Sequence, residues 1–348
     1  MPRRNRAAAL LAALLALCAQ SAAQQKSGGH WEINGTRLHY VTIGTGAPVV
    51  VLHGGPGGNL TSKLDLVSFA PSHRWVFYDQ RGCGESDRLP VDLDHLDEAA
   101  ALFSIERQVE DLDQVRARLG ADKITLLGHS WGGALAVFYA AAHPDRLTRL
   151  IVYNGGPMWP ELRAAKKAAL KARSAPEINQ RIGELVAGIS DSISTWEQDT
   201  LDARFVGMIR LLIPAYGCLS PEPPPSIEMG RGGFWANQFT NRYIKTLDRG
   251  ALARRLAQVT APTLITYGRC EPNPPERQTY LRDALPNSAM VVFDRSGHTP
   301  HVEQRELFGQ VLRAFLADQP LPLEPYHGQA SDLGWSATRT CCDGAAGD

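Results

Sequence analysis

The chain has 348 residues, of which 44% are hydrophobic and 21% are charged, a composition typical of a globular protein. Its 36 basic and 36 acidic side chains give a formal net charge of zero. This balance argues against a protein that binds nucleic acid through a strongly basic surface, and against an acidic disordered chain. The length allows two domains, or one α/β domain with an insertion.

The first 23 residues have the pattern of a secretory signal peptide. Three arginines precede an Ala/Leu-rich run over residues 7–19, and small residues at 21–23 provide a cleavage site. The alternative is a membrane-spanning helix, but the apolar run is about 13 residues long and a span needs about 20. We therefore expect cleavage after Ala23, no stable membrane insertion after it, and export to the periplasm or the extracellular space.

Cleavage there would leave five of the six cysteines in the mature chain. An odd number means that at least one thiol stays free or pairs outside the chain. The spacing matches no common zinc pattern, and the sequence does not decide which cysteines pair.

Short apolar runs alternate with helical patterns along the rest of the chain. Residues 31–43 predict a hairpin with Asn34-Gly35 as its turn. Apolar residues at helical spacing predict a helix over Ser104–Leu119. Unbroken apolar runs, typical of strands buried on both faces, occupy residues 48–53, 74–79, 123–128, 149–154, 262–267 and 289–294. The alternation predicts an α/β fold with a mostly parallel sheet flanked by helices.

Residues 157–250 interrupt this alternation, because they show amphipathic helical patterns between breakers and no convincing strand. We interpret them as a helical cap, inserted between a core of residues 24–156 and its continuation at 251–318. An insertion that leaves from the carboxyl ends of a parallel sheet lies over the crevice where ligands bind. Residues 319–348 are rich in Gly, Pro and Ala, and they predict a flexible tail.

Gly128–Gly132 forms a G-x-S-x-G sequence between a predicted strand and a predicted helix that runs to about residue 142. In this setting a serine lies on a tight turn with its hydroxyl exposed. Ser130 is therefore the candidate nucleophile, and a glycine-rich structural turn is the alternative.

A second glycine-rich segment, His53–Gly58, follows the strand predicted at 48–53. It lacks the lysine of a phosphate-binding P-loop and the G-x-G-x-x-G spacing. Beside a serine nucleophile, we interpret it as part of an oxyanion hole. The backbone N–H groups of Gly55 and Trp131 would then stabilise the tetrahedral intermediate.

A serine nucleophile needs a base, and His298 follows the strand predicted at 289–294. His301, at the start of the last helix, is the main alternative. His53 and His129 lie in loops that shape the backbone around the site, and we interpret both histidines as structural.

The base needs a carboxylate that orients it, and Glu271 follows the strand predicted at 262–267. Asp294 is the alternative, although it lies only four residues before His298. The chain order Ser130, Glu271, His298 is the order that this architecture uses.

These motifs resemble those of the proline iminopeptidases, α/β-hydrolase serine aminopeptidases with an H-G-G-P-G loop. The matching segments are residues 53–57, 78–86, 128–133, 268–271 and 297–303. The resemblance implies an α/β-hydrolase fold and an acyl-enzyme mechanism that needs neither a metal nor an organic cofactor. Asp79 and Arg81 also belong to a matching motif, and we interpret both as structural.

Two positions depart from the family pattern. The acid is usually Asp in this family, whereas position 271 carries Glu. The family also binds the free amino group of its substrate with glutamates of the cap. Glu197, in Trp196-Glu197, resembles one of these residues, and Glu228 is the nearest candidate for the second.

The sequence therefore predicts a secreted serine hydrolase that acts on a small molecule or a short peptide and not on nucleic acid. The first hypothesis is an aminopeptidase that releases N-terminal proline or another small residue. A carboxylesterase or lactonase of the same fold is the second, and a non-catalytic binding protein is the third. The sequence does not set the oligomeric state.

Overall fold

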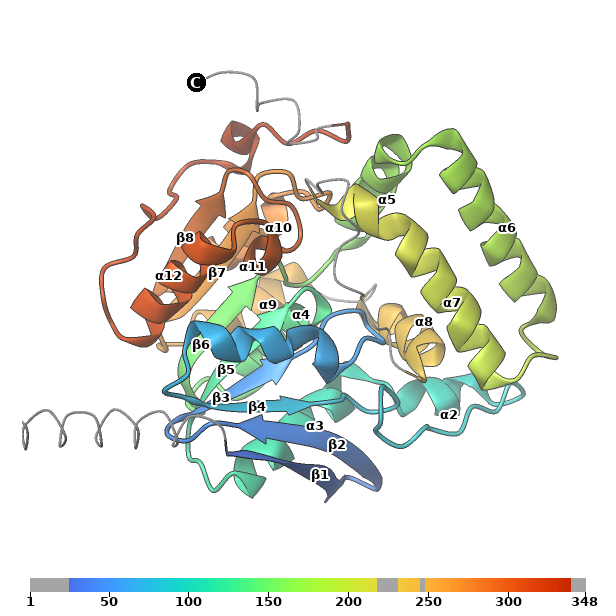
Figure 1. Ribbon diagram of the computed structural model, residues 1–348, viewed down its shortest axis with the longest axis horizontal. Coiled ribbons are helices and arrows are strands. Elements are labelled where there is room, and N and C mark those ends of the chain that lie inside the picture. Colours follow the sequence, from blue (N-terminus) through green and yellow to red (C-terminus); the bar gives the residue numbers. More distant parts are fainter. Residues whose placement is uncertain (1–24, 218–230, 245–247, 339–348) are drawn as a thin grey trace, which may run out of the picture.

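A central sheet with helices on both faces organises the computed structural model, which describes residues 25–217, 231–244 and 248–338 (Figure 1). Eight strands lie in the order β1-β2-β4-β3-β5-β6-β7-β8. The pairs β1–β2 and β2–β4 are antiparallel, and the strands from β4 to β8 pair in parallel. This topology confirms the predicted α/β fold.

The two antiparallel strands at one edge form the predicted hairpin. β1 (Lys26–Ile33) and β2 (Thr36–Ile43) are joined by Asn34 and Gly35, whose φ values are 47° and 78°. Positive φ at both central residues is what a type I′ hairpin turn requires. β1 begins at Lys26 rather than at residue 31, and its first residues are polar or glycine and mostly exposed. An exposed edge segment of this kind has no apolar pattern that could mark it.

The other six strands coincide with the unbroken apolar runs. Most of their residues are buried, which explains why the runs do not alternate with polar residues. They are β3 (Pro48–Leu52), β4 (Arg74–Tyr78), β5 (Ile124–His129), β6 (Leu147–Tyr153), β7 (Thr263–Gly268) and β8 (Ser288–Phe293). Because these strands are parallel, the residues that follow them meet at one edge of the sheet.

Two apolar clusters cover the two faces of this sheet. One cluster includes side chains of α3 (Ile105–Arg118), α4 (Trp131–Ala142), α9 (Arg249–Leu256) and α10 (Glu276–Ala284). The other includes side chains of η2 (Leu60–Phe69) and α12 (Arg305–Leu316). The helix predicted at 104–119 is α3, and the Ser104 hydroxyl accepts a hydrogen bond from the Arg107 N–H at its start.

The described residues of the predicted cap, 157–250, form helices that lie at the side of the sheet domain (Figure 1). The cap has an apolar cluster of its own, in which Phe205, Phe234 and Trp235 pack with Phe103 of the core. The described cap elements are α5 (Pro160–Arg173), α6 (Pro176–Ser192), α7 (Gln198–Leu212), η3 (Ile213–Tyr216) and α8 (Gly233–Ile244). The short α2 (Leu96–Ala101) contacts α8 and joins the cap to the core.

The prediction of a flexible tail is wrong for residues 319–338. Leu333, in the short η4 (Ala330–Leu333), is 1% exposed and belongs to the larger core cluster. The Tyr326 N–H donates to the Met290 carbonyl of β8 at 2.6 Å. The few residues that attach this segment to the core, such as Leu333 and Tyr326, are separated by Gly, Pro and polar residues, so the composition of the segment does not reveal them. The remaining residues of the predicted tail lie outside the described part of the chain.

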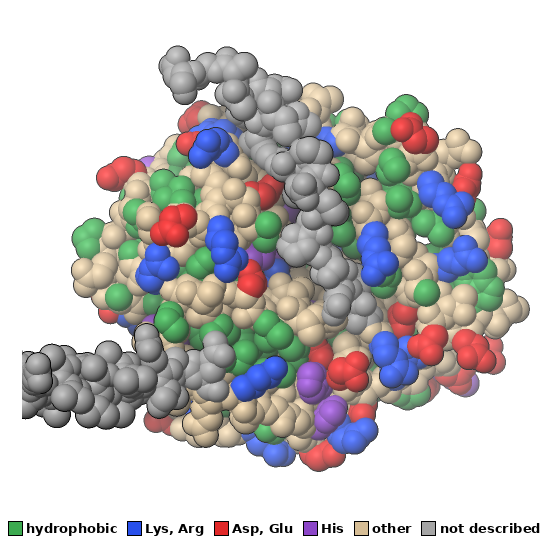
Figure 2. All heavy atoms as spheres, in the orientation of Figure 1, with side chains coloured by type: hydrophobic (Ala, Val, Ile, Leu, Met, Phe, Trp, Pro, Cys, Tyr) green, Lys and Arg blue, Asp and Glu red, His purple; other side chains and the backbone are tan. Residues whose placement is uncertain are grey.

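Basic and acidic side chains are interspersed over the face shown in Figure 2, and no single-sign patch covers it. In residues 25–217, 231–244 and 248–338, no helix has the length and apolar character needed to cross a bilayer. The predicted signal peptide, residues 1–23, lies outside the described residues.

Candidate active site

Ser130 lies on the sharp turn between β5 and α4, as the G-x-S-x-G motif predicts. Its φ of 56° and ψ of −116° are rare for a residue with a side chain. Its N–H donates to the Tyr153 carbonyl, and its own carbonyl accepts from the N–H groups of Ala134 and Gly156, each at 3.3 Å. A Cβ on Gly132 would lie 2.2 Å from the Leu52 carbonyl oxygen. Only glycine therefore lets α4 approach the sheet closely enough for this turn.

The glycine-rich loop after β3 lies directly beside Ser130. A Cβ added to Gly54 would be 3.2 Å from the Ser130 Cβ. Gly55, the next residue, has a φ of 127°. Trp131 is the first residue of α4, and the first N–H groups of a helix have no acceptor within the helix. The loop and the start of α4 thus flank the serine from two directions.

Gln80 ties these two flanking segments together. Its backbone N–H donates to His53 Nε2 at 3.0 Å, and its Nε2 donates to the His53 carbonyl at 2.9 Å. Its Oε1 accepts from the Trp131 indole N–H at 2.8 Å. Gln80 is buried, so water does not compete for these bonds. The contacts fix the loop relative to the start of α4.

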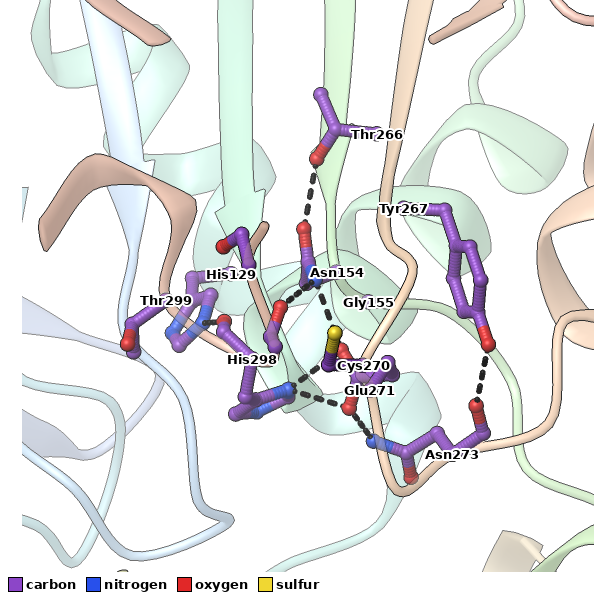
Figure 3. Close-up of polar contacts among 12 residues, drawn as sticks. His129, Asn154, Gly155, Thr266, Tyr267, Cys270, Glu271, Asn273, His298 and Thr299 are labelled. Atoms are coloured by element: carbon purple, nitrogen blue, oxygen red, sulfur yellow. Dashed lines mark hydrogen bonds and ion pairs between the residues drawn. The ribbon is translucent and has the colours of Figure 1, made fainter. Parts of the chain in front are cut away.

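His298 and Glu271 meet at the ends of β8 and β7 (Figure 3). His298 Nδ1 lies 2.9 Å from each carboxylate oxygen of Glu271. The structure does not bring the two alternative residues into these positions. His301 is buried against Tyr153 and Phe308, and its Nδ1 has no hydrogen-bond partner among the residues that the structure describes. Asp294 pairs with Arg269 at 2.6 Å and is largely exposed.

Glu271 is fully buried and surrounded by donors. Asn154 Nδ2 donates to Oε2 at 2.8 Å, and Asn273 Nδ2 donates to Oε1. Burial alone would raise the pKa of this carboxyl group, but the charge and hydrogen bond of His298 oppose it, as do the charge of Arg277 and the bond from Asn154. Together these contacts lower the pKa of Glu271 to about 2, so the group is ionised at neutral pH.

The backbone of His298 is held from both sides. Its N–H donates to the carbonyl of Tyr216 in η3 at 2.9 Å, and the two rings lie 5.1 Å apart. Its carbonyl lies 3.0 Å from His129 Nε2. Burial lowers the pKa of His129 well below its usual value, so this ring is neutral and carries its proton on Nε2, facing the carbonyl. His129 therefore holds His298, the candidate base, by a hydrogen bond to the backbone carbonyl of His298.

Asp79 and Arg81 shape the loop beneath the site. The Asp79 carboxylate accepts from the N–H groups of Leu60 and Glu85 at 2.7 and 2.9 Å. Arg81 forms a buried two-pronged pair with Asp111, at 2.6 and 2.7 Å. The bond from Leu60 to Asp79 and the pair of Arg81 with Asp111 connect chain segments that are 19 and 30 residues apart, which is consistent with a structural role of Asp79 and Arg81.

Glu197 is not brought to the candidate site. It is exposed and immediately precedes α7, whereas η3, which contacts His298, follows the other end of that helix. A helix of 15 residues is about 22 Å long. Glu228 lies outside the described residues. The described part of the cap therefore gives no support to an amine site at Glu197.

Two cysteines fall within the described residues. Cys83 is buried with a free thiol. Cys270, the neighbour of Glu271, is disulfide-bonded. In the same residues, no group of three His, Cys, Asp or Glu side chains is placed to hold a metal ion.

Comparison with known proteins matches residues 47–304 to the model of the alpha/beta hydrolase fold family. The chain is 28% identical over 306 residues to the proline iminopeptidase of Heyndrickxia coagulans, which covers 83% of this chain and 98% of that protein. It is 31% identical over 284 residues to the proline iminopeptidase of Clostridium botulinum, with coverages of 78% and 90%. The esterase EaEST of Exiguobacterium antarcticum superposes with a TM-score of 0.59 at 22% identity, over 84% of this chain and all of that chain. At that identity the likeness shows the fold alone.

Proposed function

We propose that this chain, which belongs to the α/β-hydrolase fold family, is a serine aminopeptidase that releases proline or another small residue from the N-terminus of a peptide. Its similarity to proline iminopeptidases extends over 90% or more of the two relatives described above. The observation that carries the proposal is the His298–Glu271 pair at 2.9 Å, formed at the sheet edge that also presents Ser130 on its strained turn.

Acylation begins when the Ser130 hydroxyl attacks the carbonyl of the N-terminal residue. His298 accepts the hydroxyl proton on Nε2, while Glu271 holds Nδ1–H and stabilises the positive charge that forms on the ring. The N–H groups of Gly55 and Trp131 stabilise the negative oxygen of the tetrahedral intermediate. One such donor contributes about 3 kcal/mol to lowering the barrier.

Collapse of the intermediate breaks the peptide bond. His298 gives its proton to the leaving amine, so the shortened peptide departs neutral and the N-terminal residue stays as an ester on Ser130. A water molecule then gives a proton to His298 and attacks this ester through a second tetrahedral intermediate. His298 finally returns the proton to Ser130, which releases the amino acid and restores the site.

A longer acid is compatible with this mechanism. Glutamate reaches one methylene further than the aspartate that is usual in the family, yet both oxygens of Glu271 lie at hydrogen-bond distance from Nδ1. The two amides of Asn154 and Asn273 engage the remaining acceptor positions of the carboxylate. The buried charge is therefore fully paired, as a buried ionised group needs to be.

A chromogenic comparison tests the proposal. We expect the enzyme to cleave proline p-nitroanilide, and Ser130→Ala to lower kcat by about 10⁴-fold or more, because the nucleophile is lost. If p-nitrophenyl acetate and butyrate are hydrolysed and the anilide is not, the chain is a carboxylesterase or lactonase. If no substrate is turned over and a fluorophosphonate leaves Ser130 unlabelled, the chain is not a serine hydrolase.

We also propose export after removal of residues 1–23. The support is the arginine-rich start, the apolar run and the small residues at the cleavage position. Mass spectrometry of the protein recovered outside the cytoplasm should find a mature chain that begins at Gln24. A full-length chain retained in the cytoplasm would contradict this.

A further inference from the structure

Asn154 lies at the centre of the contacts around the candidate acid and base (Figure 3). It is the first residue after β6, it has no exposed surface, and its φ is 46°. Asn is among the few residues with a side chain that tolerate this left-handed conformation. Sequence motifs do not mark it, because the G-x-S-x-G and H-G-G-P-G patterns lie elsewhere in the chain.

Every polar group of the Asn154 side chain has a partner. Nδ2 donates to Glu271 Oε2 at 2.8 Å and to the Gly297 carbonyl at 2.7 Å. Oδ1 accepts from the Thr266 hydroxyl at 2.9 Å. Since a carboxylate and a carbonyl can only accept, the side of the amide that faces them must be the nitrogen. The orientation of the amide is therefore fixed by its neighbours.

These bonds connect two separate catalytic loops. Glu271 belongs to the loop after β7, whereas Gly297 immediately precedes His298 in the loop after β8. One amide group thus spans the loop of the acid and the loop of the base. Its third bond anchors it to Thr266 inside β7, and the backbone N–H of Asn154 also donates to the Thr266 carbonyl at 3.2 Å.

We infer that Asn154 is a positioning residue, which aligns the acid and the base and lets a glutamate fill the position usual for aspartate. This inference rests on the proposed roles of Ser130, Glu271 and His298. Glutamate has one more rotatable bond than aspartate, so it needs an additional contact to keep its oxygens at His298 Nδ1. The Nδ2 of Asn154 supplies that contact and holds the adjacent loop at the same time.

Two substitutions separate this role from simple packing. Asn154→Gly removes the amide while keeping a residue that adopts positive φ without strain. Asn154→Asp keeps the shape but places a second carboxylate against Glu271. Thr263→Val is the matched control, because Thr263 is a buried residue of the same strand as Thr266, and within the described part of the chain its hydroxyl bonds only to the Ala261 carbonyl.

The primary measurement is the rate at which a fluorophosphonate labels Ser130, since it needs no knowledge of the substrate. We expect Asn154→Gly to lower this rate, and kcat for the chromogenic substrate, by about 10- to 100-fold, because small misplacements of catalytic groups cost that much. KM should stay within about threefold, since Asn154 is fully buried and its side chain bonds to Glu271, Gly297 and Thr266.

The pH profile gives an independent measurement. In Asn154→Asp, two carboxylates in contact retain a shared proton to higher pH than Glu271 alone does. Activity that needs an ionised acid should therefore appear only at higher pH, which displaces the acidic limb of kcat/KM upward. Thr263→Val should lower the melting temperature and leave the labelling rate and the pH profile unchanged.

The inference is overturned if Asn154→Gly loses thermal stability as Thr263→Val does but labels Ser130 at the wild-type rate, at a temperature where all variants are folded. A higher KM with unchanged kcat would also overturn it, since Asn154 would then serve binding. If the wild type does not cleave proline p-nitroanilide, only the peptidase proposal fails, because the rate at which the fluorophosphonate labels Ser130 still tests the role of Asn154. A wild-type serine that does not react would overturn both.

Discussion

Glu271 carries a charge in a place where water cannot reach it. An isolated carboxylate buried in this way would take up a proton, because desolvation penalises the ionised form. Here the ring of His298, the guanidinium of Arg277 and the amides of Asn154 and Asn273 replace the lost water. The same contacts that orient His298 and Glu271 therefore also determine the protonation state of Glu271.

The pKa of about 2, against 4.5 for a free glutamate, links this residue to the stability of the fold. A carboxyl group with a lowered pKa in the folded state contributes stability above pH 4.5, and the contribution is lost as the pH falls through the folded pKa. We expect the difference in unfolding free energy between wild type and Glu271→Gln to be largest above pH 4.5 and to shrink toward pH 2. Urea unfolding at a series of pH values measures it, and a difference independent of pH would contradict the assignment.

Sequence patterns identify some of these residues and miss others for physical reasons. Ser130 lies in a glycine motif, and Glu271 and His298 follow buried strands, where side chains of a parallel sheet converge. Asn154 also directly follows a buried strand, so the same signal could have found it. The three hydrogen bonds of Gln80 cannot be predicted from a local sequence pattern, because the partner residues, at positions 53 and 131, are far from it in the sequence.

Among the helices, α7 links distant parts of the cap. Asp202, within α7, accepts hydrogen bonds from the N–H groups of Gly232 and Phe234 at 2.6 and 2.9 Å, and so caps the start of α8. α8 in turn reaches the core, where Asn237 Nδ2 donates to the carbonyl of Pro56 in the glycine-rich loop at 3.1 Å. The cap is thereby connected to the loop beside Ser130.

The position of α7 leads to a prediction for Glu197. Because the length of the helix separates Glu197 from η3 and His298, we expect Glu197→Gln to change kcat/KM for proline p-nitroanilide by less than about twofold. Asp202→Asn on the same helix should instead lower the free energy of unfolding by about 1–2 kcal/mol, because it weakens a helix cap. A loss of activity in Glu197→Gln that affects free-amine substrates and spares N-blocked ones would show that Glu197 binds the amine after all.

Elements that are buried on both faces have the clearest patterns in the sequence. The parallel strands are continuous apolar runs because both of their faces are covered. η2 lacks a clear signal in the sequence, since Asn59 provides no side-chain cap and the segment places a lysine, Lys63, in a buried position. The early part of β1 has no apolar pattern, because residues at an exposed sheet edge need not be apolar.

In the whole molecule, the core, the cap and the tail meet at the loop after β7, which carries Glu271. Arg173, at the end of α5, donates to the carbonyls of Cys270 and Ala337 at 2.7 and 3.1 Å. The Trp335 indole N–H donates to the Glu271 carbonyl at 3.1 Å. The segment that follows the last core helix therefore supports the candidate active site from outside.

Leu333 should be the energetic anchor of this segment. We expect Leu333→Ala to lower the free energy of unfolding by about 2–4 kcal/mol, as large-to-small changes in a core do. Val186 on α6 is 46% exposed and serves as the control, and Val186→Ala should change stability by less than about 0.5 kcal/mol. Equal effects of the two substitutions in thermal or urea unfolding would mean that the tail does not contribute to the core.

The hydrogen bond between Tyr326 and Met290 also affects whether strands of other molecules can pair with the edge of the sheet. β8 is the outermost strand of its side, and an open strand edge recruits strands from other molecules. The tail contacts that edge where the Met290 carbonyl accepts the Tyr326 N–H, while β1 at the opposite edge is mostly exposed and begins with Lys26-Ser27-Gly28-Gly29. We therefore expect the last segment of the fold to hinder the addition of further strands at the Met290 position of this edge, as well as to stabilise a single copy.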